Sequence, residues 1–169
     1  PAPRPSTPQV VLARLAALRA AVERGEEPAR IAATLVEDVV LLTRATQGAL
    51  VRFAASDDPV RIASAATPGL SSREVELSRT LLGRMLREER AVFVPSTLDD
   101  AELAGARSLA STGPLSALAV PVFAEGRIVG ALYLSAPSVP GLSPEATDLA
   151  TAYTSEAAAL MDAQQVRAR

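Results

Sequence analysis

Residues 115–136, LSALAVPVFAEGRIVGALYLSA, limit the possible folds of this chain more than any other stretch. The stretch is apolar almost throughout, with one short polar break, Glu125-Gly126-Arg127, near its centre. Each apolar arm is too short to cross a membrane and too rich in strand-forming residues for a helix. The pattern therefore predicts a hairpin with strands of about 115–124 and 127–136. Strands that are apolar on both faces need cover on both faces, so the hairpin is expected to form the floor of a sheet.

The rest of the chain predicts elements that can supply this cover. In chain order they are helices 9–24 and 28–45, strands 47–56 and 60–67, a helix from a Ser71 cap to Arg90, a strand 91–95, a short helix from Asp100 to about Ala110, the hairpin, and a helix from a Ser143 cap to about Gln165. The predicted fold class is α+β, with a central antiparallel sheet of five to six strands. The terminal helices cover one face, and the middle helix with the segment 96–114 covers the other. Gly130 lies in mid-strand, where a neighbouring element is expected to approach closely.

The predicted domain organisation is simple. Residues 1–8 are a Pro-rich tail or linker, residues 9–27 an N-terminal helix, residues 28–165 the folded domain and residues 166–169 a tail. A length of 169 residues suits one domain with a real core.

Composition excludes several classes of function. The chain contains no His and no Cys, which excludes a thiol nucleophile, a Ser-His triad, a disulfide, a zinc site and a His-ligated haem as these are ordinarily built. The net charge of −2 argues against nucleic-acid binding, because phosphate contacts need a clustered basic surface. No signal peptide and no spanning helix is expected, so the predicted location is cytoplasmic.

The N-terminal helix carries an apolar stripe. Val11, Leu15, Leu18 and Val22 recur at spacings of 4, 3 and 4, which is typical of a helix that packs along another helix. The last helix has its own apolar line, formed by Leu149, Tyr153, Ala157 and Leu160. We expect these two helices to pair with their copies in a homodimeric four-helix bundle. The alternative is that the first helix folds back on its own domain and the chain is a monomer.

At the hairpin the chain resembles the GAF domain family, and the resemblance spans about residues 28–164. The carrying segments are ATQGALVRF (45–53), REERAVFVPSTLDDAELAGARSL (87–109), the hairpin, and LSPEATDLATAYTSEAAALMDA (142–163). In the hairpin the family has a small residue, a strand ending in Val-Pro, a Gly turn and a Gly-x-Leu strand. Here these are Ser116, Val120-Pro121, Glu125-Gly126 and Gly130-Ala131-Leu132.

The resemblance implies a GAF-like, PAS-related fold and a role as a small-molecule sensor or a dimerising relay. Family pockets lie on the sheet face opposite the terminal helices. The family's known cofactors do not fit, because the chain has no Cys for a covalent bilin and no His for haem. The catalytic Cys residues of the family's free methionine-sulfoxide reductases are missing too, and without Lys the cyclic-nucleotide signature is incomplete. No cofactor and no metal is expected.

Five residues are candidates for contact with a ligand. Arg52 interrupts an apolar strand and could bind an anionic group in a dry pocket, although a surface-facing arginine is the alternative. Ser108, Ser111 and Ser116 flank the loop where family ligands lie, but they equally suit loops and caps. Phe93 completes the set, with core packing as its alternative. Asp99 and Asp100 favour a turn or a helix cap, and no catalytic residue is predicted.

The leading hypothesis is a non-enzymatic regulatory sensor domain of a bacterial signalling or transcription-regulatory protein. Its expected partners are a second copy of the chain, an unidentified small molecule and an output module outside this chain, with neither nucleic acid nor membrane. The alternative is a ligand-free dimerisation scaffold with a filled pocket, and an enzyme is a distant third.

Overall fold

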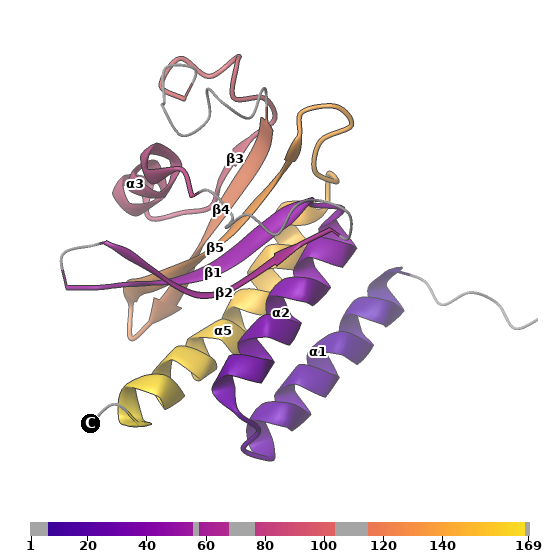
Figure 1. Ribbon diagram of the computed structural model, residues 1–169, viewed down its shortest axis with the longest axis vertical. Helices are drawn as coiled ribbons and strands as arrows, with labels where there is room; N and C mark the ends of the chain where they lie inside the picture. Colours follow the sequence, from indigo (N-terminus) through magenta and orange to yellow (C-terminus); the bar gives the residue numbers. More distant parts are fainter. Residues whose placement is uncertain (1–6, 56–57, 68–76, 104–114, 168–169) are drawn as a thin grey trace, which may run out of the picture.

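The computed structural model describes residues 7–55, 58–67, 77–103 and 115–167. These residues form one antiparallel five-stranded sheet in the order β2-β1-β5-β4-β3 and four helices (Figure 1). The strands are β1 (Gln47–Phe53), β2 (Pro59–Ala66), β3 (Val92–Val94), β4 (Leu115–Ala124) and β5 (Arg127–Pro137). The helices are α1 (Thr7–Glu23), α2 (Pro28–Thr43), α3 (Arg79–Glu88) and α5 (Ala146–Arg167). The predicted α+β class is confirmed.

The apolar hairpin lies at the centre of the sheet, as its pattern predicts. β5 is the middle strand and β4 is its neighbour on the side of β3. A two-residue turn joins them, in which Glu125 and Gly126 have φ values of 52° and 75°. Positive φ at both central positions is the geometry that suits the right-handed twist of a two-residue hairpin.

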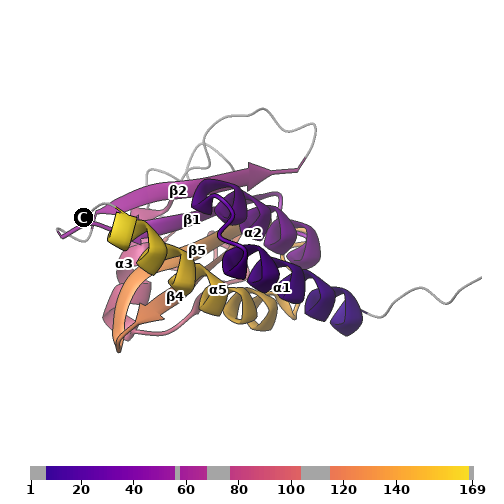
Figure 2. The same ribbon diagram turned by 90° about the horizontal axis from the view of Figure 1, so that it is seen from below.

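The two faces of the sheet have different cover. Helices α1, α2 and α5 lie on one face and α3 lies on the other, and Figure 2 shows α1 on the outside of the three-helix layer. Side chains of β4 alternate between the faces. Leu118, Val120 and Val122 join the core with α2 and α5, whereas Ala117 and Ala119 face α3. The terminal helices therefore share one face, as expected.

The floor beneath α3 is built from small residues. Ala49 of β1, Ala117 and Ala119 of β4 and Ala131 of β5 are all fully buried there. Above them α3 contributes larger apolar side chains, those of Leu81, Leu82 and Met85. Alanines at the centre of the sheet let a single short helix pack close to the strands.

Gly130 is crowded, as predicted for a glycine in mid-strand. A Cβ atom at this position would lie 2.5 Å from Cε of Met161 in α5 and would overlap the carbonyl oxygen of Val51 in β1. The close approach involves both a helix and the neighbouring strand.

Two helix starts differ from the sequence prediction. Helix α3 begins at Arg79 rather than near Ser71, and Ser78 caps it by accepting the amide hydrogen bond of Leu81 at 3.2 Å. Helix α5 begins at Ala146, and the Ser143 hydroxyl has no hydrogen-bond partner, so the predicted Ser143 side-chain cap is wrong.

Other predicted features fall partly outside the description. Ser71 and most of the helix predicted over 100–110 lie beyond the described residues, and residues 101–103 form turns. Over the part of the chain that is described, no helix is long and apolar enough to span a bilayer.

Candidate functional site

The three predicted ligand contacts that the structure describes, Arg52, Phe93 and Ser116, do not form one site, since only Phe93 lines a cleft with the charged residues near α3. Ser108 and Ser111 lie outside the described residues. Phe93 lies between Val92 and Val94, which pack against α3, so its own side chain points to the other face and is 43 % exposed.

Arg52 and Ser116 lie on the face of the sheet that α1, α2 and α5 cover. They were predicted to line a pocket on the opposite face, and that position is corrected. Arg52 pairs with Gly130, and the space above Gly130 is filled by Met161 of α5. The Ser116 hydroxyl is buried and accepts the amide hydrogen bond of Leu142 at 3.3 Å, which ties β4 to the loop before α5. Ser116 is therefore a structural residue, and neither side chain can contact a ligand bound beneath α3.

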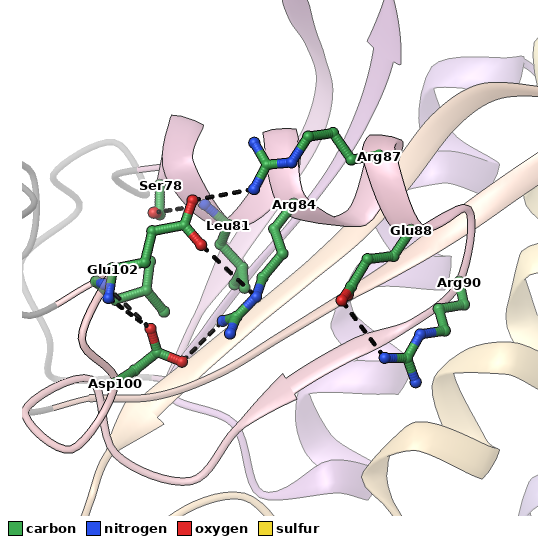
Figure 3. Close-up of polar contacts among 9 residues, drawn as sticks. Ser78, Leu81, Arg84, Arg87, Glu88, Arg90, Asp100 and Glu102 are labelled. Atoms are coloured by element: carbon green, nitrogen blue, oxygen red, sulfur yellow. Dashed lines mark hydrogen bonds and ion pairs between the residues drawn. The ribbon is translucent and has the colours of Figure 1, made fainter.

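A polar cluster lies at the solvent side of α3 (Figure 3). Arg84 donates a hydrogen bond of 2.8 Å to Oδ2 of Asp100, and its Nε lies 3.8 Å from Oε2 of Glu102. Arg87 donates to the other oxygen of Glu102 at 3.1 Å. We call Arg84, Arg87, Asp100 and Glu102 the α3 cluster. The α3 cluster joins one side of α3 to residues 100–102, which follow β3.

Asp100 is the centre of this cluster. Its Oδ1 accepts the amide hydrogen bonds of Glu102 and Leu103, which is the turn role predicted for it. The hydrogen bond from Arg84 holds the pKa of Asp100 below its usual range, with help from those two amides, and the pairing raises the pKa of Arg84. The charged pair therefore fastens residues 100–103 to α3 at neutral pH.

A cleft of about 340 Å³ lies next to the α3 cluster, along the outer edge of β3. Its charged lining residues are Arg84, Glu88, Arg90, Asp99 and Asp100, and the chain from Ala91 to Ser96 forms its wall. Glu88 and Arg90 pair with each other at 3.4 Å. Charges of both signs suit a small polar ligand that both donates and accepts hydrogen bonds.

The cleft lacks the features of a metal centre. Across the residues that are described, no group of three or more Asp or Glu side chains could hold an ion. Sequence reasoning did not single out Arg84. Its only signal was its place on a helix that precedes the Asp99-Asp100 turn.

A second, apolar groove of about 950 Å³ lies in the helical layer, where α1 meets the end of α2 and the start of α5. Its apolar lining includes Val11, Leu12, Leu15, Leu42, Leu142 and Leu149. Leu12 is the most exposed of the α1 side chains in this set, at 68 %.

The residues predicted for a dimer interface divide into two sets. Val11, Leu15 and Leu149 line the groove, and Val22 is partly buried against the core. Leu18, Tyr153 and Leu160 are buried inside the protomer, because α1 packs on its own α2 and α5. These three side chains are not at a surface that a second copy could meet.

Two ion pairs also hold α1 in place, and neither is predicted by the sequence patterns. Arg14 lies 2.5 Å from Oδ1 of Asp38 in α2, and Arg19 lies 3.2 Å from Oε1 of Glu156 in α5. Burial raises the pKa of Asp38 although Arg14 opposes the shift. Helical spacing could have indicated the first pair, because Arg14 is four residues before the buried Leu18 and therefore lies on the same face of α1.

The fold, the polar cleft and the apolar groove define an α+β domain with a hairpin-centred antiparallel sheet, which three helices cover on one face and α3 covers on the other. The family model for the GAF domain matches residues 25–162, and the chain belongs to the GAF domain family. GAF domains are commonly sensor or regulatory domains of signalling proteins. No curated protein matches the chain.

Solved structures with similar folds include GAF domains from several bacteria. The GAF domain of a phosphoenolpyruvate-protein phosphotransferase from Acinetobacter is 17 % identical with a TM-score of 0.70, covering 92 % of this chain and 95 % of that one. The GAF domain/HD domain protein of Geobacter sulfurreducens is 20 % identical with a TM-score of 0.65, covering 82 % and 95 %. The free methionine-R-sulfoxide reductase of Neisseria meningitidis, solved with its substrate, is 15 % identical with a TM-score of 0.63, covering 93 % and 91 %. The same fold therefore occurs in the GAF domains of a phosphotransferase and of a GAF domain/HD domain protein, and in a reductase.

Proposed function

We propose that this chain is a non-enzymatic regulatory domain of a bacterial signalling or transcription-regulatory protein. It binds a small polar molecule on the α3 side of the sheet, pairs with a second copy through its helical layer, and controls an output module outside this chain. The cleft beside the α3 cluster is the observation that carries the proposal.

The contrast between the two faces of the sheet supports this assignment. The helical face is packed with large side chains from three helices, whereas α3 is a single helix of ten residues over a floor of alanines. A ligand in the cleft would meet Arg84 and Asp100 directly. By competing for their ion pair, it would loosen the segment 100–103 from α3, and a conformational signal would begin there.

The absence of Cys and His supports a non-enzymatic role for this member of a fold that also occurs in a reductase. A thiol-dependent reduction would need a residue that the chain does not contain. The proposal includes no cofactor, for the same reason.

Native mass spectrometry of the purified chain, followed by thermal-shift screening with small polar metabolites, tests the ligand. We expect either a non-covalent adduct or a stabilising compound, and the Arg84→Ala variant should lose it. Arg127→Ala is the matched control, because this exposed arginine is the first residue of β5 and does not line the cleft. A wild type without adduct or shift favours the ligand-free scaffold, which the dense apolar packing under α3 also suits.

Sedimentation velocity at tens of micromolar tests the homodimer. Leu12→Glu should give a monomer, because this side chain lines the apolar groove and is 68 % exposed. Leu98→Glu is the control, since Leu98 is 65 % exposed but follows β3, away from the helical layer. A monomeric wild type, or a dimer that survives Leu12→Glu, would refute pairing through this groove.

A further inference from the structure

Helix α1 is attached to the domain more weakly than α2 is. Among the described α1 side chains only Leu18 and Ala21 are buried, whereas α2 buries nine residues. Helix α1 packs on α2 and α5 from outside and has no acidic residue in its first turn and no basic residue in its last. Segments with few buried apolar contacts are the ones that open first in a folded protein.

The charged contacts of α1 follow one pattern. Both arginines come from α1, and both carboxylates are buried on the helices beneath, with side-chain exposures of 9 % for Asp38 and 10 % for Glu156. Burying a carboxylate costs about as much as its ion pair returns, so such pairs set orientation more than they add stability. The two pairs therefore fix where α1 lies without holding it tightly.

A third polar group makes the packed position of α1 on α2 and α5, which we call the docked state, less favourable. The hydroxyl of Tyr153 in α5 is buried and has no hydrogen-bond partner. Burial raises the pKa of Tyr153, and the negative charge of Asp38 adds to the shift, so the hydroxyl lies within the electrostatic reach of the first ion pair. Water could hydrate both Tyr153 and Asp38 once α1 moved away.

The connection between α1 and α2 is suited to act as a hinge. Residues 24–27 are exposed, and Gly25 has φ +71° with open space where a Cβ would be. Pro28 occupies the first turn of α2, where it prevents the two helices from joining into one.

We propose that α1 is a latched arm, which swings off α2 and α5 as a unit about residues 24–27 while the sheet, α2 and α5 keep their structure. The latches are Arg14 on Asp38 and Arg19 on Glu156. The arm is a conformational switch that goes beyond the proposed function, because its opening requires neither a ligand in the cleft nor a second copy.

Hydrogen exchange of the full chain, followed by mass spectrometry at peptide resolution, tests the arm. Helix α1 ends in a glycine cap at Gly25, but once undocked it loses the packing that gives a helix most of its stability, so its amides exchange faster and report each opening. In the wild type, α1 should exchange faster than α2 and α5. Arg14→Met leaves Asp38 buried without its partner only while α1 is docked, and we expect α1 exchange to rise by about tenfold or more.

Tyr153→Phe provides the opposite test. It removes the unpartnered hydroxyl from the docked state and should slow α1 exchange several-fold, although the substitution is on α5 and not on α1. Arg127→Ala is the control, because this exposed arginine at the start of β5 lies outside α1 and its hinge and should leave α1 exchange unchanged.

The outcomes separate clearly. Opposite effects of Arg14→Met and Tyr153→Phe, confined to α1, support the latched arm. Exchange of α1 at the same rate as α2 in the wild type would overturn it, as would variants that shift α1 in the same direction or not at all. If Arg14→Met failed to fold, Tyr153→Phe would still decide, because removal of a buried unpartnered hydroxyl should not destabilise the chain.

Discussion

Replacement of Gly130 by alanine should destabilise the domain through steric overlap at the centre of its sheet. The new Cβ would lie 2.5 Å from Cε and 2.9 Å from Sδ of Met161, and would overlap the carbonyl oxygen of Val51. Carbon atoms in contact prefer a separation of about 3.5–4.0 Å, so each neighbour must move by roughly an ångström.

The two neighbours differ in how easily they can move. Met161 can change rotamer, since its side chain is long and unbranched. The Val51 carbonyl cannot, because β1 is paired with β2 on one side and β5 on the other. Overpacking of this kind costs about 1–3 kcal/mol, and the lower backbone entropy of alanine offsets about 0.5–1 kcal/mol. We therefore expect a net loss of about 1 kcal/mol, and a melting temperature lower by about 2–4 °C.

Urea denaturation followed by far-ultraviolet circular dichroism measures this loss, since the chain has no Trp to report by fluorescence. The urea midpoint should fall at an unchanged slope. Gly83→Ala in α3 is the matched control, because only Nη1 of Arg87, at 3.9 Å, comes within 4 Å of the new Cβ. The control should gain up to about 1 kcal/mol from helix propensity. An unchanged or higher midpoint for Gly130→Ala would show that β1 and α5 do not approach this strand as described.

Three further predictions concern single side chains. Ser78→Ala should cost about 1 kcal/mol in urea denaturation, because it removes the cap that Leu81 uses, whereas Ser71→Ala, at the cap predicted from the sequence, should not. The Asp100 carboxylate has a lowered pKa in the fold, so it contributes stability that is present above its unfolded pKa and is lost as the pH falls through its folded pKa. Urea midpoints measured from pH 5 to 2 should therefore fall less steeply with acid in Arg84→Ala than in the wild type. Burial raises the pKa of Asp38 in the folded chain, so the free energy of unfolding falls as the pH rises from the unfolded pKa to the folded pKa of this carboxyl. Asp38→Asn should remove this fall, and an unchanged pH profile of the urea midpoint would contradict the burial of Asp38.

Much of the architecture could be predicted from local sequence patterns. The hairpin, the two N-terminal helices, the first two strands and the position of the last helix follow from periodicity and turn residues, which act over a few neighbours. Glu125-Gly126 was readable as a turn for the same reason, and the close approach to Gly130 followed from a glycine in mid-strand. The start of α3 was misplaced because Ser71 and Ser78 both have the chemistry of a cap, and only the folded chain shows that Ser78 serves Leu81.

The candidate sites depended on the tertiary structure. The sequence is compatible with Arg52 and Ser116 as pocket residues, but the register of the sheet places both on the face that α2 and α5 cover. The apolar stripe of α1 was equally consistent with a second chain and with its own domain, since a stripe does not specify its partner. The pairs Arg14–Asp38 and Arg84–Asp100 join residues 24 and 16 positions apart, across separate elements. Sequence patterns determine which residues share a face of one element, but only the packing of elements decides what that face meets, because burial and ion pairing depend on distances between segments remote in the chain.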